Sequence, residues 1–120
     1  MEIIYQDICI RKADSRDAEQ LCKWWNDGSI MAHAGFPLGL GTTVEKIIEQ
    51  LSDSSSEKYR HMILYKQIPI GEMMYGDLGN HICEIGIKIC NDTMQNKGLG
   101  KKILSLFLHE LFESLHFEKV

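Results

Sequence analysis

The first third of the chain combines a short apolar run with two stretches whose apolar residues follow a helical spacing. Residues 8–12 favour a β-strand, and Asp14 or Ser15 can then cap a helix by accepting a backbone N–H. That helix is expected to end at residues 26–28, and its apolar positions are Ala18, Leu21, Cys22, Trp24 and Trp25. The Gly-bearing stretch 30–42 is expected to be an ordered loop. Thr43 then caps a second helix, whose apolar face consists of Val44, Ile47, Ile48 and Leu51.

The middle of the chain changes to the pattern of β-strands. Apolar runs at 62–65, 70–75 and 81–90 are separated by turn-rich segments at 66–69 and 76–80. Three strands with short connections predict an antiparallel meander. Ile85, Ile87 and Ile89 alternate with smaller or polar residues, which indicates one strongly apolar face.

A long helix is predicted from Gly100 to Leu115. Two apolar stripes run along it, with residues four apart: Ile103, Phe107 and Leu111 in one, and Leu104, Leu108 and Phe112 in the other. So broad an apolar face suits packing across a sheet. Residues 117–120 read as the start of a further strand. The sequence therefore predicts an α/β (α+β) fold with a mixed, mostly antiparallel central sheet flanked by helices.

Composition narrows the function classes. The chain has 120 residues with 44% apolar and 25% charged side chains, which indicates one globular domain spanning residues 1–120. The polar cluster 52–57 is interpreted as a loop rather than a domain linker. A net charge of −4 disfavours nucleic acid as a partner. No apolar run is long enough for a membrane span, and the acidic residues in 1–12 do not fit a signal peptide.

The cysteines and histidines predict neither disulfides nor a metal site. Cys9, Cys22, Cys83 and Cys90 form no CxxC pair and lie in apolar stretches, so we interpret them as free thiols of a cytoplasmic protein. The histidines lack ligand spacing relative to these cysteines.

The segment most informative about chemistry lies between the last long strand and the long helix. Its residues are Gln95, Asn96, Lys97, Gly98, Leu99, Gly100 and Lys101, followed by Lys102. Glycines permit positive φ and close backbone approach, and the following helix start presents unpaired N–H groups and a positive dipole end. With three lysines and no acid in the stretch, the segment predicts an anion site, and phosphate is the expected anion.

Three phosphate-binding patterns and one simpler explanation compete for this segment. A P-loop requires four residues between its glycines, and here one separates Gly98 from Gly100. The dinucleotide pattern requires a glycine where Ile103 stands. The pattern Gln/Arg-x-x-Gly-x-Gly/Ala fits at every fixed position. The simpler explanation is a helix N-terminus with solvated lysines.

The third pattern resembles the pyrophosphate-binding loop of the GNAT superfamily of N-acetyltransferases. The order of predicted elements is also similar to that family over nearly the whole chain. Residues 84–89, residues 95–104 and the Trp25-Asn26-Asp27 segment resemble the branch of ribosomal-protein-alanine acetyltransferases. Asp92 stands where the family often has proline. The family also continues beyond the position of Val120, so we expect the domain to be incomplete at its C-terminus and to lack a Tyr that often protonates the departing thiolate.

The resemblance implies an acyl-CoA N-acyltransferase fold with acetyl-coenzyme A as co-substrate. The implied coenzyme contacts lie in two segments: Ile87, Lys88, Ile89 and Cys90 along the pantetheine arm, and Gln95, Asn96, Lys97, Gly98, Leu99, Gly100 and Lys101 at the pyrophosphate. A backbone N–H in the Lys88–Cys90 region would polarise the thioester carbonyl. The acceptor would be the amine of a small molecule or a peptide.

Catalysis of amine acetylation also requires a group that removes a proton from the amine. Glu84 and Glu72 are the candidates, because each lies in a predicted central strand, where a charge is unusual. The alternative is that both are solvated or paired on an open sheet face. Trp24, Trp25 and residues 36–39 are candidates for the acceptor side, although adjacent aromatic residues more often divide between core and surface. His33 is interpreted as a polar loop residue.

Two other function classes remain open from the sequence. One is a catalytically silent coenzyme A-binding or interaction module, and the other is a nucleotide-binding regulatory domain. An open sheet edge at residues 117–120 and an uncovered helix stripe favour self-association, so a homo-oligomer is expected.

Overall fold

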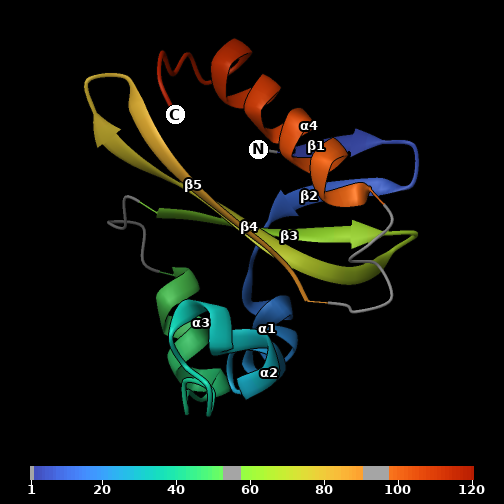
Figure 1. The fold of residues 1–120 in the computed structure, drawn as a ribbon, viewed down its shortest axis with the longest axis vertical. Helices are drawn as coiled ribbons and strands as arrows, with labels where there is room; N and C mark the ends of the chain where they lie inside the picture. Colours follow the sequence, from blue (N-terminus) through green and yellow to red (C-terminus); the bar gives the residue numbers. More distant parts are fainter. Residues whose placement is uncertain (1, 53–57, 91–97) are drawn as a thin grey trace. The chain divides into compact units, whose positions relative to one another are not determined.

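The computed structural model describes residues 2–52, 58–90 and 98–120 (Figure 1). The chain divides into two compact units, one formed by residues 1–12 and 56–120 and the other by residues 13–55. Each unit is described by itself below.

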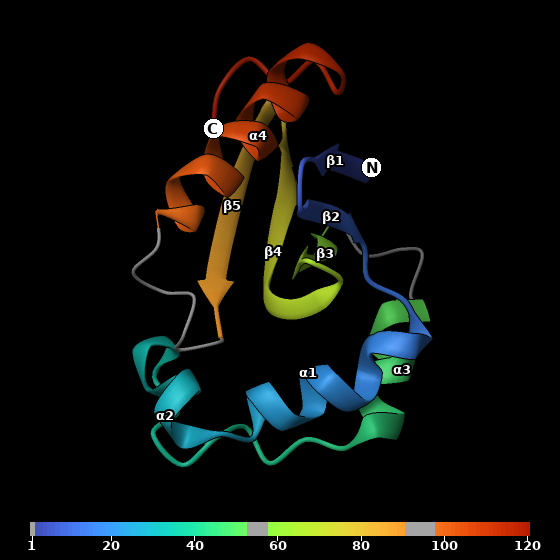
Figure 2. The ribbon, with the colours of Figure 1, turned by 90° about the vertical axis from the view of Figure 1, so that its right-hand side faces the viewer.

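The first unit is built on a five-stranded sheet in the order β1-β2-β3-β4-β5 (Figures 1 and 2). Its strands are β1 (Glu2–Tyr5), β2 (Ile8–Lys12), β3 (Lys58–Tyr65), β4 (Ile68–Gly79) and β5 (Ile82–Ile89). All neighbouring strands are antiparallel. The predicted meander and the mostly antiparallel sheet are confirmed. Every pair of neighbouring strands is antiparallel, whereas we expected a mixed sheet. The parallel element is an isolated bridge between Ile82 and Lys119, within the segment predicted to begin a strand.

The turns explain where the strand boundaries differ from the prediction. Lys66 and Gln67 both have positive φ, as do Asn80 and His81. Positive φ at two consecutive residues is the requirement of the tight hairpin turn that matches strand twist. The second turn therefore comes at Asn80 and His81, and β4 continues through residues 76–79, where the sequence suggested a turn. Strand β1 was not predicted at all.

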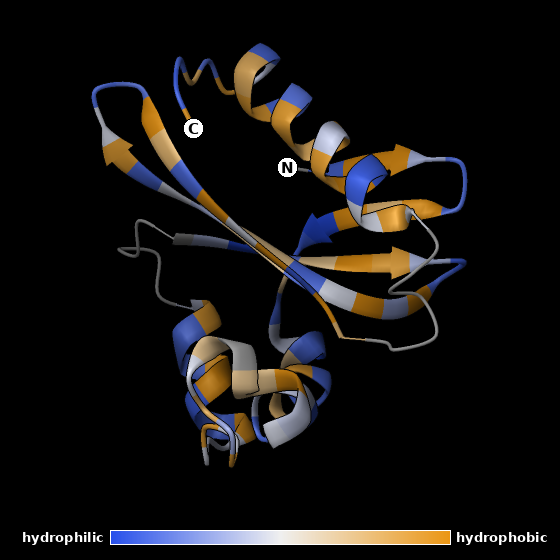
Figure 3. Ribbon diagram, in the orientation of Figure 1, coloured by the Kyte–Doolittle hydropathy of each residue, from blue (hydrophilic) through white to orange (hydrophobic). Residues whose placement is uncertain are grey.

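Helix α4 (Leu99–Glu113) covers one face of this sheet (Figure 2). Its predicted stripe of Ile103, Phe107 and Leu111 is fully buried and forms a core with residues of the strands, among them Ile10 and Ile63. Figure 3 shows the corresponding apolar bands on α4 and on the strands. The second stripe is less covered: Leu104 and Leu108 are half-buried and Phe112 is exposed.

A buried histidine lies inside this core among aromatic rings. The His61 ring centroid is 5.5 Å from that of Phe107 and 5.8 Å from that of Tyr75, and its Nδ1 lies 3.1 Å from the Tyr59 carbonyl. The side chain is 2% exposed. Burial, more than the nearby positive charges, lowers the pKa of His61 from 6.5 to about 4. His61 is therefore neutral in the folded protein at neutral pH.

Acidification is expected to destabilise the protein through His61. The unfolded chain takes up a proton near pH 6.5, whereas the folded chain does so near pH 4. The contribution of neutral His61 to the free energy of unfolding is thus complete above pH 6.5. This free energy falls by about 3 kcal/mol as the pH falls towards 4. Urea unfolding of the wild type and of His61→Phe at several pH values measures the difference between the two. Parallel pH profiles of the two unfolding free energies would contradict the expectation.

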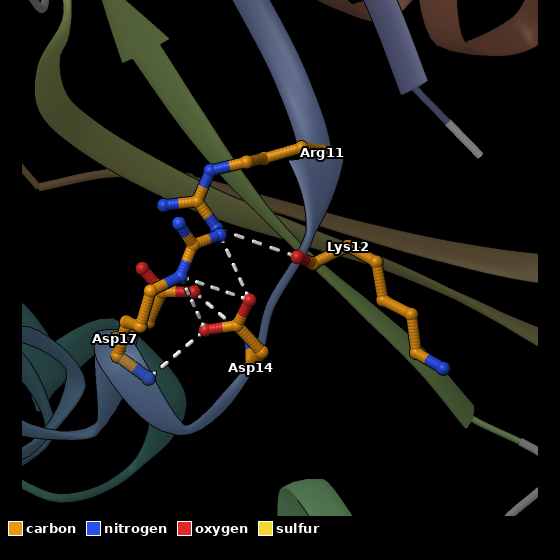
Figure 4. A network of polar contacts seen from close by, with 5 residues as sticks. Arg11, Lys12, Asp14 and Asp17 are labelled. Atoms are coloured by element: carbon orange, nitrogen blue, oxygen red, sulfur yellow. Dashed lines mark hydrogen bonds and ion pairs between the residues drawn. The ribbon is translucent and has the colours of Figure 1, made fainter.

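The second unit is helical and starts from a capping box. Asp14 accepts the backbone N–H of Arg16 at 2.9 Å, and Asp17 accepts that of Asp14 at 2.9 Å (Figure 4). These contacts begin the 3-10 turn η1 (Ser15–Asp17), and α1 (Ala18–Trp25) follows as predicted. The predicted helix after Thr43 is α3 (Val44–Ser52), and the Thr43 hydroxyl accepts the N–H of Lys46 at 3.3 Å.

The stretch predicted as one loop contains two short helical turns. Asp27 accepts the backbone N–H of Ser29 at 2.9 Å and so starts α2 (Gly28–Met31), which η2 (Ala32–Ala34) extends. Residues 26–28, predicted only as the end of the preceding helix, thus also contain the cap of a second one. The remaining loop is ordered: the Asn26 side chain bonds both to the N–H of Thr42 at 2.8 Å and to its carbonyl at 2.9 Å.

Candidate functional site

The predicted anion site begins at the N-terminus of α4. Residues 95–97 lie outside the described residues, and residues 98–101 are described. Gly98 precedes the helix with φ of 73°, a left-handed conformation that favours glycine. The first N–H groups of α4 have no acceptor within the helix, as at any helix start.

Gly100 differs from Gly98 in an informative way. Its φ is not in the left-handed region, so the backbone does not require glycine. Among the described residues, apart from its chain neighbours and the backbone of its own helix, a Cβ atom built on Gly100 would meet no atom within 4 Å. The packing of the described residues therefore gives no reason for glycine at this position, which fits a backbone kept open for close approach by a ligand.

Two lysines in the first turn of α4 behave differently. Lys101 is exposed. The Lys102 ammonium lies 4.3 Å from the centroid of the Tyr5 ring, a cation–π contact with strand β1. Lys102 thus has an aromatic partner, and of this pair Lys101 is the better candidate for an anion contact.

The predicted thioester segment, Ile87–Cys90, forms the end of β5 and the residue after it. Strand β5 is at the edge of the sheet, next to β4. The Cys90 N–H donates to the Ile70 carbonyl at 2.7 Å. That N–H already has an acceptor, which makes it a poor candidate for polarising a thioester.

The four cysteines are free thiols, with Cys83 and Cys90 buried.

The two candidate carboxylates lie on one face of the sheet, opposite the α4 side, but not together. Glu72 pairs in register with Lys88, and Glu84 pairs with Gly76. Four residues along the ladder separate the two positions, or about 13 Å. Glu84 is exposed, and its carboxylate lies above Gly76. The two residues are therefore alternatives rather than a catalytic pair.

Glu72 is buried and forms an ion pair with Arg60 of β3. The side chain of Glu72 is 5% exposed and that of Arg60 30%. The two residues are diagonal neighbours, because Arg60 pairs with Met74 and Glu72 with Met62. Sequence reasoning missed Arg60 because the predicted strand began at residue 62. A strand extended back by two residues places Arg60 on the same face as Met62, the partner of Glu72, because side chains alternate along a strand.

The predicted acceptor residues belong to the second unit. Trp24 and Trp25 are buried there. Leu38 is 94% exposed and Phe36 43%. The loop that carries them is tightly built: a Cβ on Gly39 would lie 2.3 Å from the Asn26 carbonyl oxygen, and one on Gly28 would lie 2.0 Å from that of Pro37. The His33 side chain lies outside the described ones.

The described part of the chain holds neither a cluster of metal ligands nor a membrane-spanning helix. Within residues 2–52, 58–90 and 98–120, no group of three or more His, Cys, Asp or Glu side chains is arranged to hold a metal ion. No helix among these residues is long and apolar enough to cross a membrane.

Comparison with known families decides the classification. The family model described as "Acetyltransferase (GNAT) domain" matches residues 7–120. The chain is a member of the GNAT acetyltransferase family. A comparison with curated protein sequences found no significant match.

Solved structures of several acetyltransferases share the fold of this chain. A probable acetyltransferase is 24% identical with a TM-score of 0.73, over 98% of this chain and 70% of the other. The ribosomal-protein-S5-alanine acetyltransferase of Vibrio fischeri is 14% identical with a TM-score of 0.74, over 98% of this chain and 70% of the other. The aminoglycoside acetyltransferase AAC(6')-Ib, solved with coenzyme A, is 18% identical with a TM-score of 0.74, over 91% and 69%. The ribosomal-protein-alanine branch is thus one of several to which this GNAT chain is similar.

Proposed function

We propose that this GNAT protein transfers the acetyl group of acetyl-coenzyme A directly to the amine of a small molecule or a peptide. The observation that carries the proposal is the open backbone at Gly98 and Gly100, at the N-terminus of the 15-residue helix α4. A helix start with accessible N–H groups is suited to a pyrophosphate. Membership of the family and the coenzyme A complexes of AAC(6')-Ib support the same co-substrate.

The residues proposed to hold acetyl-coenzyme A belong to two elements that follow one another in the sequence. The pyrophosphate is assigned to Gly98, Leu99, Gly100 and Lys101 at the start of α4, together with residues 95–97, which lie outside the described residues. Ile87–Cys90 of the β5 end line the pantetheine arm and the thioester. Acetyl-coenzyme A supplies an activated acyl group, so the protein's own task is to orient it, polarise its carbonyl and accept a proton from the amine.

We assign proton removal to Glu84 ahead of Glu72. The Glu84 carboxylate is exposed to water and to an incoming amine. Glu72 is buried, and its carboxylate oxygen Oε1 accepts a hydrogen bond from the Arg60 guanidinium. A carboxylate oriented by such an ion pair is better suited to holding the sheet face than to exchanging protons with an acceptor.

Ligand-induced stabilisation and turnover test the proposal in turn. Acetyl-coenzyme A and coenzyme A should raise the melting temperature, and ATP should not. Thiol release from acetyl-coenzyme A is then followed with a panel of polyamines, aminoglycosides and peptides with free N-termini. Stabilisation by ATP alone would indicate a nucleotide-binding domain. Coenzyme A binding without turnover on any amine would indicate a silent binding module.

Replacing Glu84 with glutamine is expected to lower kcat and to leave the KM for acetyl-coenzyme A nearly unchanged. A general base acts on the amine in the transition state, so its loss should reduce the rate by roughly a hundredfold. The measurement is steady-state kinetics with the best amine of the panel. Glu113→Gln, a change of an exposed carboxylate at the end of α4, is the matched control. An unchanged kcat over the whole pH range would remove Glu84 from the mechanism.

A further inference from the structure

A side chain at Gly71 of β4 would collide with the backbone of β5. A Cβ built on Gly71 would lie 2.2 Å from the Lys88 carbonyl oxygen and 3.0 Å from the Ile89 Cα. Both neighbours are backbone atoms, so no side-chain rotation relieves the clash. The φ of Gly71 is not left-handed, so close approach and not conformation requires glycine there.

The strand pairing around Gly71 is irregular on the side of β3. Gly71 pairs with Ile63 of β3 and with Ile89 of β5, whereas Pro69 pairs with Leu64. Ile70 is thus an additional residue on β4, and the strand bulges at that point. The buried Ile70 presents its carbonyl to the Cys90 N–H at 2.7 Å. The bulge and Gly71 together set the position of the last residues of β5 against β4.

These last residues are the segment to which the proposed function assigns the thioester. We propose that Gly71 is a positioning residue for acetyl transfer. Because Gly71 has no side chain, the Lys88–Cys90 backbone can pack directly against β4, and this backbone is the segment proposed to polarise the thioester carbonyl. The inference rests on the proposed function. Any larger residue would push this segment outward at the sheet edge, where no further strand opposes the movement among the described residues.

The test compares Gly71→Ala with Gly86→Ala in the full chain. A Cβ on Gly86 would lie 3.4 Å from the Met74 sulfur, an ordinary contact with a flexible side chain in the same pair of strands. Gly71→Ala is expected to lower kcat roughly ten- to a hundredfold, as displacements near 1 Å do. The Kd for coenzyme A, measured by calorimetry, should change less than about threefold, because the pyrophosphate is held at α4. Gly86→Ala should match the wild type in both.

The pH dependence of kcat separates this role from an effect through the neighbouring Glu72. A displaced thioester segment lowers kcat without moving the profile, whereas a displaced base moves it. A shifted profile, an undiminished kcat in Gly71→Ala or an equal loss in Gly86→Ala would each overturn the inference while the proposed function stands. A wild type that does not bind coenzyme A would overturn both.

Hydrogen exchange in the wild type covers the case in which Gly71→Ala does not fold. If Gly71 and the bulge fix the segment, the Cys90 amide exchanges slowly in the ligand-free protein, by about a hundredfold or more against an unstructured amide. Its protection should then change little when coenzyme A is added. Fast exchange that slows only with ligand would show that the ligand and not the sheet positions the segment, and would overturn the inference.

Discussion

Replacing Arg60 with alanine is expected to lower the free energy of unfolding by about 3 kcal/mol. The substitution removes the guanidinium from the Glu72 carboxylate, which is 5% exposed and has little access to water as a replacement. The lost Coulomb attraction is then not offset by solvation of the charge. Urea denaturation at neutral pH measures the change.

A second substitution in the same background separates charge from packing. Glu72→Gln added to Arg60→Ala should recover part of the loss, because an amide is less costly to bury than a carboxylate. If Arg60→Ala lowers the unfolding free energy by less than about 0.5 kcal/mol, the ion pair behaves like an exposed one. A double variant as unstable as the sum of the two single ones would assign the effect to packing.

Gly100→Val is expected to abolish coenzyme A binding while the protein stays folded. The new side chain would extend into space that holds no atom of the described residues outside its own helix backbone and chain neighbours within 4 Å of its Cβ, and this is the space proposed for the pyrophosphate. The helix itself tolerates the change, since valine is no worse than glycine within a helix. Calorimetry should show at least a hundredfold rise in Kd, and the unfolding free energy should be unchanged or slightly higher.

Ser105→Val is the matched control, because it places the same side chain at an exposed position of α4. It should bind coenzyme A like the wild type. Gly98 is a less informative site for this test, since its φ of 73° would strain any β-branched residue. Wild-type affinity in a folded Gly100→Val protein would show that the pyrophosphate does not lie over this helix start.

Periodicity predicted the elements that have one strongly apolar face. The stripe of Ile103, Phe107 and Leu111 and the strand alternation around Ile87 both repeat long enough to identify α4 and β5. Strand β1 escaped prediction because Glu2–Tyr5 is a short edge strand with Ile4 exposed, so no alternation marks it. The α2 turn escaped because a single Asp27 contact with Ser29 decides it.

Glycine spacing before an apolar helix predicted an anion site, since such a site needs only N–H groups and no side chain. The structure places Gly98 and Gly100 at the start of α4, and anion binding there stays a prediction. The arrangement of the carboxylates depends on strand register and was not predicted. The separation of Glu72 from Glu84 and the pairing of Glu72 with Arg60 follow from which residues face each other across strands. A one-residue difference in register would change both, and the sequence of one strand does not specify its partner's alignment.

The connectivity of the sheet has a consequence for the order in which the protein folds. Strands β3, β4 and β5 follow one another through tight turns, so their pairing closes only short loops. The pairing of β2 with β3, in contrast, brings Ile8 next to Tyr65 and must close a loop that contains the whole helical unit of residues 13–55. Closing a long loop costs more chain entropy and slows folding. The meander of residues 58–90 is therefore expected to form early, with the β1–β2 hairpin joining it late and completing the core beneath α4.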